Sequence, residues 1–270
     1  MPQATLTVDA AFGARLAVTL HGEGPALLLI PGLGASRRVF DPIVQSLAGR
    51  HRVVVYDPRG VGDSALGTAA LTLPLLAADA VAVLEACGAE SADVFGASMG
   101  GVVAQHMALE HQPHVRRLIL AATSPGGGHA IPADPRVTAA LLGKGARTPA
   151  DAYRKACTVL YSPKFQRTHQ DFIEEQVRIR SAHPVRGRVF AAQLEALHTQ
   201  DDLFDRLPSL TMPTLVAHGT ADVVSPFENA QLLASRIPGA QTRRFDECGH
   251  LFFHERPEES ARVVGEFLRG

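Results

Sequence analysis

The sequence predicts an α/β fold, a doubly wound and mostly parallel sheet interrupted by one helical insertion. Short, fully apolar runs alternate with stretches that carry apolar residues at three- and four-residue intervals. Such runs are typical of strands buried on both faces of a parallel sheet, and the stretches between them are typical of crossover helices. The alternation stops between Pro125 and Pro208 and then resumes. A chain of 270 residues suits one large domain with such an insertion.

Each predicted element follows from its local pattern. The first part of the chain, to about residue 22, alternates weakly between apolar and polar side chains, which predicts an antiparallel hairpin at the sheet edge. The parallel strands are predicted at 26–30, 52–56, 94–95, 117–122, 214–218 and 241–245. The helices between them are predicted at 39–47, 73–87, 101–111, 227–237 and 257–268.

The segment that interrupts the strand–helix alternation is predicted to stand over the carboxyl ends of the strands. Helical patterns at 149–160 and 169–180 are richer in charge and aromatic residues than the rest of the chain. The alternative places these helices in the outer layer of the sheet, but the missing strand favours an insertion. The predicted core is therefore 1–125 and 208–270, and the predicted helical cap is 126–207.

Composition excludes several classes of protein. With a net charge of -1 and a pI near 6.9, the chain lacks the excess positive charge typical of proteins that bind nucleic acid or an anionic membrane. The three cysteines are odd in number and widely spaced, which fits a reducing compartment rather than a disulfide framework. No signal peptide is expected, and Pro74, Asp79 and Glu85 break the most apolar stretch, so a cytoplasmic protein is predicted. No metal or other cofactor is expected, because no cluster of residues has ligand spacing.

The pentapeptide Gly96-Ala97-Ser98-Met99-Gly100 is the strongest functional motif. It follows a short apolar run and precedes a helical pattern, the context in which G-x-S-x-G forms a nucleophile elbow. The sharp turn strains the serine backbone, so the neighbouring positions need the small size of glycine. A Gly-rich turn that contains a serine by chance is the alternative, and the motif alone does not decide between them.

Partners for Ser98 follow later strands of the predicted sheet. Asp222 comes after the strand at 214–218, and His250 comes after the strand at 241–245. A serine hydroxyl is a weak nucleophile that needs a base, and the base needs a carboxylate to fix its tautomer. Because carboxyl ends of parallel strands meet at one sheet edge, the three side chains are expected to lie together in the order Ser, Asp, His.

A loop after the first parallel strand supplies the third requirement, a site for the oxyanion. Pro31-Gly32-Leu33-Gly34 leaves the strand expected beside the one that carries Ser98. The backbone N–H groups of Leu33 and Met99 are the candidate donors. A plain strand-ending turn is the alternative. The expected position of this loop beside Ser98 favours an oxyanion hole.

With these motifs the chain resembles the α/β-hydrolase superfamily, specifically its helical-capped serine esterases, lactonases, perhydrolases and C–C bond hydrolases. The segment from Tyr56 to Ser64 is similar to the family's D-x-R-G-x-G-x-S turn. The resemblance covers nearly all of the chain outside the insertion. It implies the α/β-hydrolase fold with a helical cap, with Ser98 as nucleophile, Asp222 as acid, His250 as base, and Leu33 and Met99 as oxyanion-hole amides. Where the family usually has His-Gly, this chain has Pro31-Gly32, so a histidine contribution there is lost.

The function expected from this resemblance is a serine hydrolase that cleaves a small carboxylic ester or lactone through an acyl-enzyme. Its partner is a small-molecule substrate, and nothing in the sequence specifies an oligomeric state. A serine at the elbow argues against haloalkane dehalogenase and epoxide hydrolase chemistry, for which similar proteins use aspartate. An enol-lactone or C–C bond hydrolase is one alternative, and a ligand-sensing receptor with slow turnover is an alternative of another class.

Other residues resemble catalytic groups but are interpreted as structural. Asp57 and Arg59 are expected to form a charge pair that holds their Gly-rich turn, and His254 is expected to be a packing or surface group. Asp246 lies too near a strand end to replace Asp222.

The cap is expected to turn its apolar residues inward and enclose an apolar pocket over Ser98. These residues are Leu141, Leu142, Val159, Tyr161, Phe165, Phe172 and Phe190. The cap arginines at 178, 180, 186 and 188 are expected in solvent, and one that reached inward would favour a carboxylated substrate.

Overall fold

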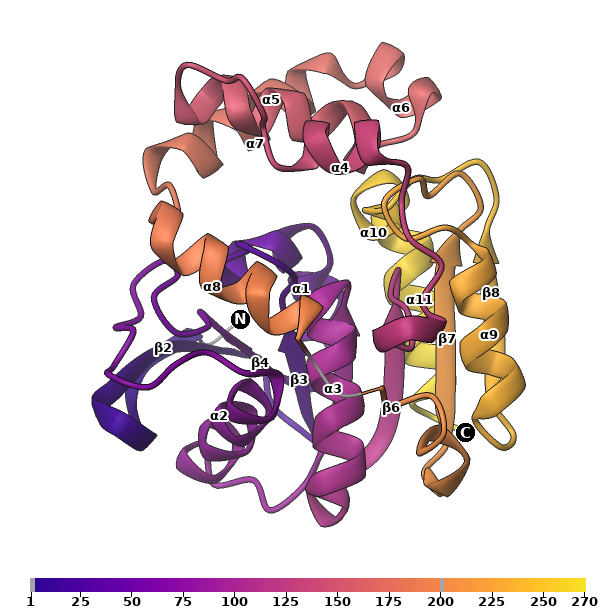
Figure 1. Ribbon diagram of the computed structural model, residues 1–270. Coiled ribbons are helices and arrows are strands. Elements are labelled where there is room, and N and C mark those ends of the chain that lie inside the picture. The colour runs from indigo at the N-terminus through magenta and orange to yellow at the C-terminus, as the bar shows by residue number, and fades with distance from the viewer. Residues whose placement is uncertain (1–2, 200–201) are drawn as a thin grey trace.

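The computed structural model describes residues 3–199 and 202–270, and an eight-stranded sheet runs through it in the order β1-β2-β4-β3-β5-β6-β7-β8 (Figure 1). The β1–β2 hairpin is antiparallel to the rest, and β3 to β8 run parallel to one another. The strands are β1 (Gln3–Ala10), β2 (Ala14–His21), β3 (Ala26–Ile30), β4 (Arg52–Tyr56), β5 (Ala92–Ala97), β6 (Val115–Ala121), β7 (Thr214–Gly219) and β8 (Gln241–Phe245). The predicted edge hairpin and mostly parallel sheet are confirmed.

Helices cover both faces of the sheet. They are α1 (Asp41–Leu47), α2 (Leu73–Ala86), α3 (Met99–Glu110), α9 (Glu228–Arg236), α10 (Phe252–Glu255) and α11 (Pro257–Phe267), with short 3₁₀ turns at Ala11–Gly13, Arg37–Phe40, Gln112–His114, Gly127–His129 and Leu207–Ser209. Helices α2, α3 and α9 share one apolar core, and α1, α10 and α11 share the other. No helix in the described part of the chain is both long and apolar enough to cross a membrane.

Strand β3 shows why a fully apolar run marks a central strand. All five of its residues are buried. Because successive side chains point to opposite faces, Leu27 and Leu29 enter the core beside α1, and Leu28 and Ile30 enter the core beside α3. Apolar surface at every position is therefore removed from water.

Between β6 and β7 the described residues form helices and no strand. These helices are α4 (Pro135–Leu141), α5 (Pro149–Leu160), α6 (Pro163–Thr168), α7 (Gln170–Ala182) and α8 (Gly187–His198). Helices α4 to α7 form a layer beyond the carboxyl edge of the sheet, and α8 crosses back over the core (Figure 1). Val189 and Ala196 of α8 are buried within the core that α2 and α3 share. We propose that 126–207 forms a cap unit on a core of 1–125 and 208–270, with α8 as its base.

Candidate active site

The backbone of Ser98 has the strained conformation expected of a nucleophile elbow. Ser98 connects β5 to α3 with φ 56° and ψ −124°, in a region that non-glycine residues rarely adopt. A Cβ on Gly96 would lie 2.3 Å from the Gly100 carbonyl oxygen, and one on Gly100 would lie 2.1 Å from the Ile30 oxygen. Both glycines are therefore required by the packing of the turn.

Two hydrogen bonds hold the elbow in this strained form. The Ser98 N–H donates to the Ala121 oxygen at 2.9 Å, and the Thr123 hydroxyl donates to the Ser98 oxygen at 2.7 Å. Both partners lie at the end of β6, the strand next to β5. The neighbouring strand therefore fixes the direction of the serine, whose half-buried side chain faces a large cavity.

Asp222 and His250 form a buried pair in the loops that follow β7 and β8. His250 Nδ1 donates to Asp222 Oδ2 at 2.8 Å, and Asp222 Oδ1 accepts the N–H groups of Val224 and Ser225 at 2.8 and 2.9 Å. Burial by itself raises the pKa of Asp222, but the charge of His250 and hydrogen bonds from His218 and His250 outweigh it and lower the pKa to about 2. Asp222 is therefore ionised and holds the proton of His250 on Nδ1.

Ser98 and His250 line the same cavity, so the structure brings the three predicted triad residues to one place. Among the described residues, no hydrogen bond links the Ser98 hydroxyl to the His250 ring. Free enzymes often show this contact lengthened until a substrate binds. The unbonded Nε2 of His250 is left available to accept a proton.

His218 is a site residue that sequence reasoning missed. It is fully buried at the end of β7, with Nε2 2.7 Å from the Ser225 oxygen and 3.1 Å from Asp222 Oδ2. Since both partners only accept, Nε2 carries a proton and lies beside the same carboxylate oxygen that accepts from His250. In the sequence His218 is only the last residue of a strand, so no local signal marks it.

The predicted oxyanion loop lies directly against the elbow because β3 pairs with β5. A Cβ on Gly32 would lie 3.0 Å from the Ser98 Cβ, so glycine permits this approach. The N–H groups of Leu33 and Met99 donate none of the loop and cap hydrogen bonds found among the described residues. Both amides are therefore free to donate to an oxyanion formed at Ser98.

The cap holds the oxyanion loop through Gln193. This fully buried side chain on α8 accepts the Gly34 N–H at 2.9 Å, and Gly34 has the positive φ, 61°, that favours glycine. Gly34 follows Leu33, so this bond fixes the direction of the candidate donor. Sequence reasoning did not identify Gln193.

We expect Gln193→Leu to lower kcat by about 10-fold, because it leaves the half-buried Gly34 N–H without its acceptor and loosens the loop. Steady-state kinetics on a p-nitrophenyl ester measure the effect, and Glu195→Ala, at an exposed position of the same helix, is the matched control. Circular dichroism melting separates a loss of fold from a loss of rate. Wild-type kcat in folded Gln193→Leu protein would contradict the role of this bond.

The expected Asp57–Arg59 pair is wrong, because each residue has a different partner. Arg59 is fully buried and donates to both oxygens of Asp79 on α2, at 2.5 and 2.6 Å. Asp57 pairs with Arg37 and accepts its backbone N–H at 2.8 Å. The turn directs the two side chains toward different helices, so it is held from both sides rather than by an internal pair.

Among the described residues, His254 and Asp246, which were set aside as structural, form hydrogen bonds or ion pairs with partners other than Asp222 and His250. Burial lowers the pKa of His254 to about 4, so the neutral ring donates from Nε2 to the Val39 oxygen at 2.7 Å and accepts from Tyr161 at 2.9 Å. Asp246 is exposed and pairs with Arg244 at 3.1 Å.

Glu255 ties the loop that carries His250 to the cap. Its Oε1 accepts the N–H groups of Gly249 and Ser162 at 3.0 and 2.7 Å, and its Oε2 accepts the Ser162 hydroxyl at 2.6 Å. Gly249 directly precedes His250, so the cap and the candidate base share one anchor. Sequence reasoning missed this residue as well.

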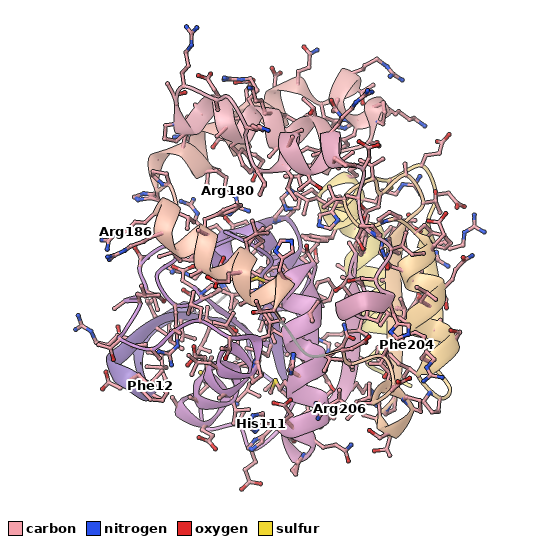
Figure 2. All side chains as sticks on the ribbon, viewed as in Figure 1. Phe12, His111, Arg180, Arg186, Phe204 and Arg206 are labelled. Atoms are coloured by element: carbon pink, nitrogen blue, oxygen red, sulfur yellow. The ribbon has the colours of Figure 1, made fainter. Side chains whose placement is uncertain are left out.

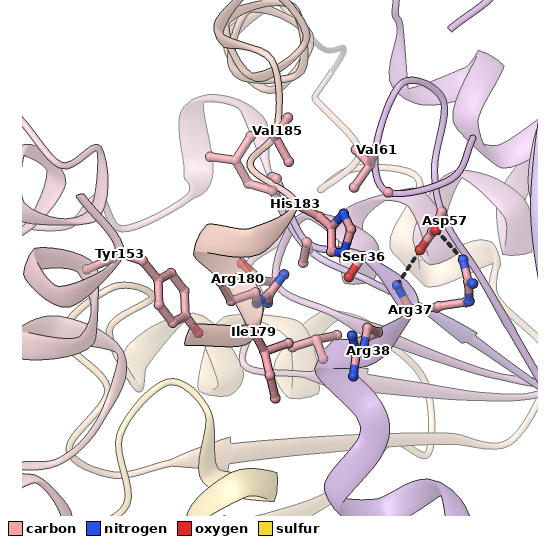
Figure 3. Close-up of a pocket in the computed structure, with 18 of the residues that line it drawn as sticks. Ser36, Arg37, Arg38, Asp57, Val61, Tyr153, Ile179, Arg180, His183 and Val185 are labelled. Atoms are coloured by element: carbon pink, nitrogen blue, oxygen red, sulfur yellow. Dashed lines mark hydrogen bonds and ion pairs between the residues drawn. The ribbon is translucent and has the colours of Figure 1, made fainter. Parts of the chain in front are cut away.

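The cavity above Ser98 has a volume of about 860 Å³ and lies between the cap helices and the core (Figure 3). Of the apolar cap residues expected to line it, three do so: Leu141, Leu142 and Phe190. Three others form an aromatic cluster with His254 that attaches the cap to the core: Tyr161, Phe165 and Phe172. Val159 belongs to neither group, so the expectation is correct for part of the set.

Residues 25–257 match the family model for the alpha/beta hydrolase fold, which is most of the chain. The chain belongs to the α/β-hydrolase family. Its fold and the order of its site residues along the sequence agree with this membership.

Individual relatives are hydrolases or contain a matching segment. The chain is 29% identical to the pimeloyl-[acyl-carrier protein] methyl ester esterase of Aeromonas hydrophila, over 94% of this chain and 99% of that protein. It is 32% identical to a segment of the polyketide synthase ThaQ of Burkholderia thailandensis. The match covers 95% of this chain but only 12% of that much longer protein. A thermophilic esterase from Thermogutta terrifontis is 28% identical with a TM-score of 0.82, covering 100% of this chain and 98% of that one.

Proposed function

We propose that this α/β-hydrolase is a serine hydrolase that cleaves a small carboxylic ester or lactone through an acyl-enzyme. The observation that carries the proposal is the buried Asp222–His250 pair, joined at 2.8 Å, which opens onto the same cavity as the elbow serine. Hydrolysis is also the activity named for the esterases to which this chain is similar.

In the proposed reaction, the Ser98 oxygen attacks the carbonyl carbon of the substrate while His250 Nε2 takes the hydroxyl proton. The carbonyl oxygen becomes an oxyanion that accepts from the N–H groups of Leu33 and Met99. His250 then gives its proton to the leaving alkoxide, and the ester C–O bond breaks to leave an acyl-Ser98. Water, deprotonated by the same nitrogen, releases the acid and restores the serine.

A small substrate is favoured because the cavity of about 860 Å³ is bounded by cap side chains. We expect kcat/KM to be highest for acetate to octanoate esters or for lactones, and to fall for palmitate esters. A panel of p-nitrophenyl acetate, butyrate, octanoate and palmitate, with lactones and a vinylogous 1,5-diketone added, measures this order. A maximum at palmitate would contradict the small-substrate proposal.

The same panel separates an enzyme from a receptor that retains a working triad. Sustained release of p-nitrophenol over many turnovers supports hydrolysis as the function. A burst equal to the protein concentration with no steady state supports a ligand-sensing role and would overturn the proposal. Faster cleavage of the 1,5-diketone than of every ester would assign C–C bond hydrolysis instead.

A further inference from the structure

One arginine in the cavity above Ser98 has no acidic partner. Three arginines line the cavity, and two of them are neutralised. Arg37 pairs with Asp57 and with Asp63 at 2.8 Å, and Arg38 lies 3.5 Å from Asp41. The third, Arg180, takes part in no ion pair among the residues that the structure describes, and its guanidinium contacts the Tyr153 side chain.

Arg180 lies near the end of α7 on the cap wall of the cavity. It is half-buried, and its Cζ stands 5.4 Å from the centre of the Tyr153 ring. Figure 2 shows Arg180 between the layer of cap helices and α8, whereas Arg186 points away from the molecule. The other three arginines that were expected in solvent, at 178, 186 and 188, are exposed and do not line the cavity. Of the four arginines that were expected in solvent, Arg180 is therefore the one that faces the cavity.

Tyr153 on α5 adds a second unsatisfied group at the same wall. Its hydroxyl is buried and has no hydrogen-bond partner within the described chain. Burial raises the pKa of Tyr153, and Arg180 offsets only part of this rise, so the hydroxyl remains protonated and is a hydrogen-bond donor. Figure 3 shows Arg180 between Tyr153 on one side and Arg37 and Asp57 on the other.

A half-buried cation without a counter-ion and a buried hydroxyl without an acceptor both cost free energy in the folded protein. Such groups are typical of sites where a bound ligand supplies the missing counter-ion and hydrogen-bond acceptor. A guanidinium matches the two oxygens of a carboxylate in a bidentate contact, and a phenol donates a third hydrogen bond to the same group. The one unpaired positive charge at this wall matches the single negative charge of a carboxylate, whereas a phosphate group carries more charge than Arg180 balances.

We propose that Arg180 and Tyr153 form a binding site for a carboxylate on the substrate, at the cap end of the cavity that contains Ser98. The substrate class is then an ester or lactone that carries a free carboxylate, such as the half-ester of a dicarboxylic acid. The assignment rests on the proposed hydrolase function, because it names the second anchor of a molecule whose carbonyl lies at Ser98. Apolar cap residues such as Leu141 and Ile179 would contact the chain between the two ends.

The kinetic test compares monoethyl adipate with ethyl hexanoate, in which a methyl group replaces the carboxylate. In Arg180→Gln we expect kcat/KM for monoethyl adipate to fall by about 10- to 100-fold, the loss typical of a charge-assisted contact, while ethyl hexanoate changes by less than about 3-fold. Arg180→Lys retains part of the preference, and Tyr153→Phe lowers it by a few-fold. Arg178→Gln, at an exposed arginine paired with Glu175, is the control. Equal losses for both esters, or no loss, would overturn the site.

A binding measurement separates failure of this site from failure of the proposed function. Adipamate, the monoamide of adipic acid, and hexanamide are titrated by calorimetry into wild-type and Arg180→Gln protein. Tighter binding of adipamate that disappears in Arg180→Gln supports the site even if no ester is turned over. Ester hydrolysis in the wild type together with equal binding of both amides leaves the hydrolase function intact and refutes the carboxylate site.

Discussion

Ser98→Ala is expected to lower kcat by ~10⁴-fold or more, the scale found when the nucleophile of a catalytic triad is removed. The backbone of Ser98 is held at φ 56° because its N–H donates to the Ala121 oxygen and its oxygen accepts from the Thr123 hydroxyl, so alanine adopts the same turn and the fold is retained. What is lost is the hydroxyl that we propose forms the acyl-enzyme. Steady-state kinetics on p-nitrophenyl butyrate measure the loss.

Covalent labelling gives an independent check on the nucleophile. A fluorophosphonate probe is expected to label one serine in the wild type and none in Ser98→Ala. Ser36 lines the same cavity but has an ordinary extended backbone, so Ser36→Ala is the matched control and keeps both label and activity. Labelling that persists in Ser98→Ala would contradict the assignment of Ser98 as the nucleophile.

The strands that the sequence predicted best are those buried along their whole length. For β3 and β4 the predicted and observed bounds agree, because every position but the first of β4 is buried and apolar. The predicted strand at 94–95 is too short, since β5 extends from Ala92 to Ala97. Its ends carry Asp93 and Gly96, which favour loops in a local pattern. The sheet buries Asp93 beside Arg116, at 3.1 Å, a contact that no local pattern contains.

Helix α3 shows how the elbow changes a helix boundary. The helix is predicted to start at Gly101, directly after the pentapeptide that is interpreted as a turn. The observed helix begins at Met99, and a Cβ on Gly101 would lie 2.6 Å from the Thr123 side chain. Glycine is needed there for close packing inside the helix, so tertiary contact outweighs propensity.

The candidate triad residues carry chemical signatures that the sequence displays, whereas the residues that hold them in place do not. Ser98, Asp222 and His250 each follow a predicted strand and have residue types with defined catalytic roles. Gln193 supports the oxyanion loop from 159 residues away, and Glu255 links a loop of the core to the cap. Such contacts depend on how the cap sits on the sheet, which a single sequence does not encode locally.

Asp222→Asn is expected to lower kcat by ~10⁴-fold while leaving the fold intact. In the wild type, Asp222 Oδ2 accepts from His250 Nδ1, and Oδ1 accepts two backbone N–H groups. An asparagine whose oxygen keeps the backbone bonds turns its NH₂ group toward His250. The ring then accepts at Nδ1 and carries its proton on Nε2, so it cannot take the proton of Ser98.

The acid-unfolding profile of Asp222→Asn tests the same carboxylate without relying on turnover. The folded pKa of Asp222, about 2, lies below its ordinary value of 3.8, so its ionised form stabilises the protein above pH 3.8 and this contribution is lost as pH falls toward 2. Asp222→Asn is therefore expected to be less stable at neutral pH and to lose less stability than the wild type over that acid interval. Asp246→Asn, at the exposed carboxylate paired with Arg244, is the control for both measurements and should resemble the wild type. Only the carboxylate that orients His250 controls which ring nitrogen is free to accept the serine proton. Loss of activity in Asp246→Asn together with normal turnover in Asp222→Asn would therefore assign that carboxylate's role to Asp246.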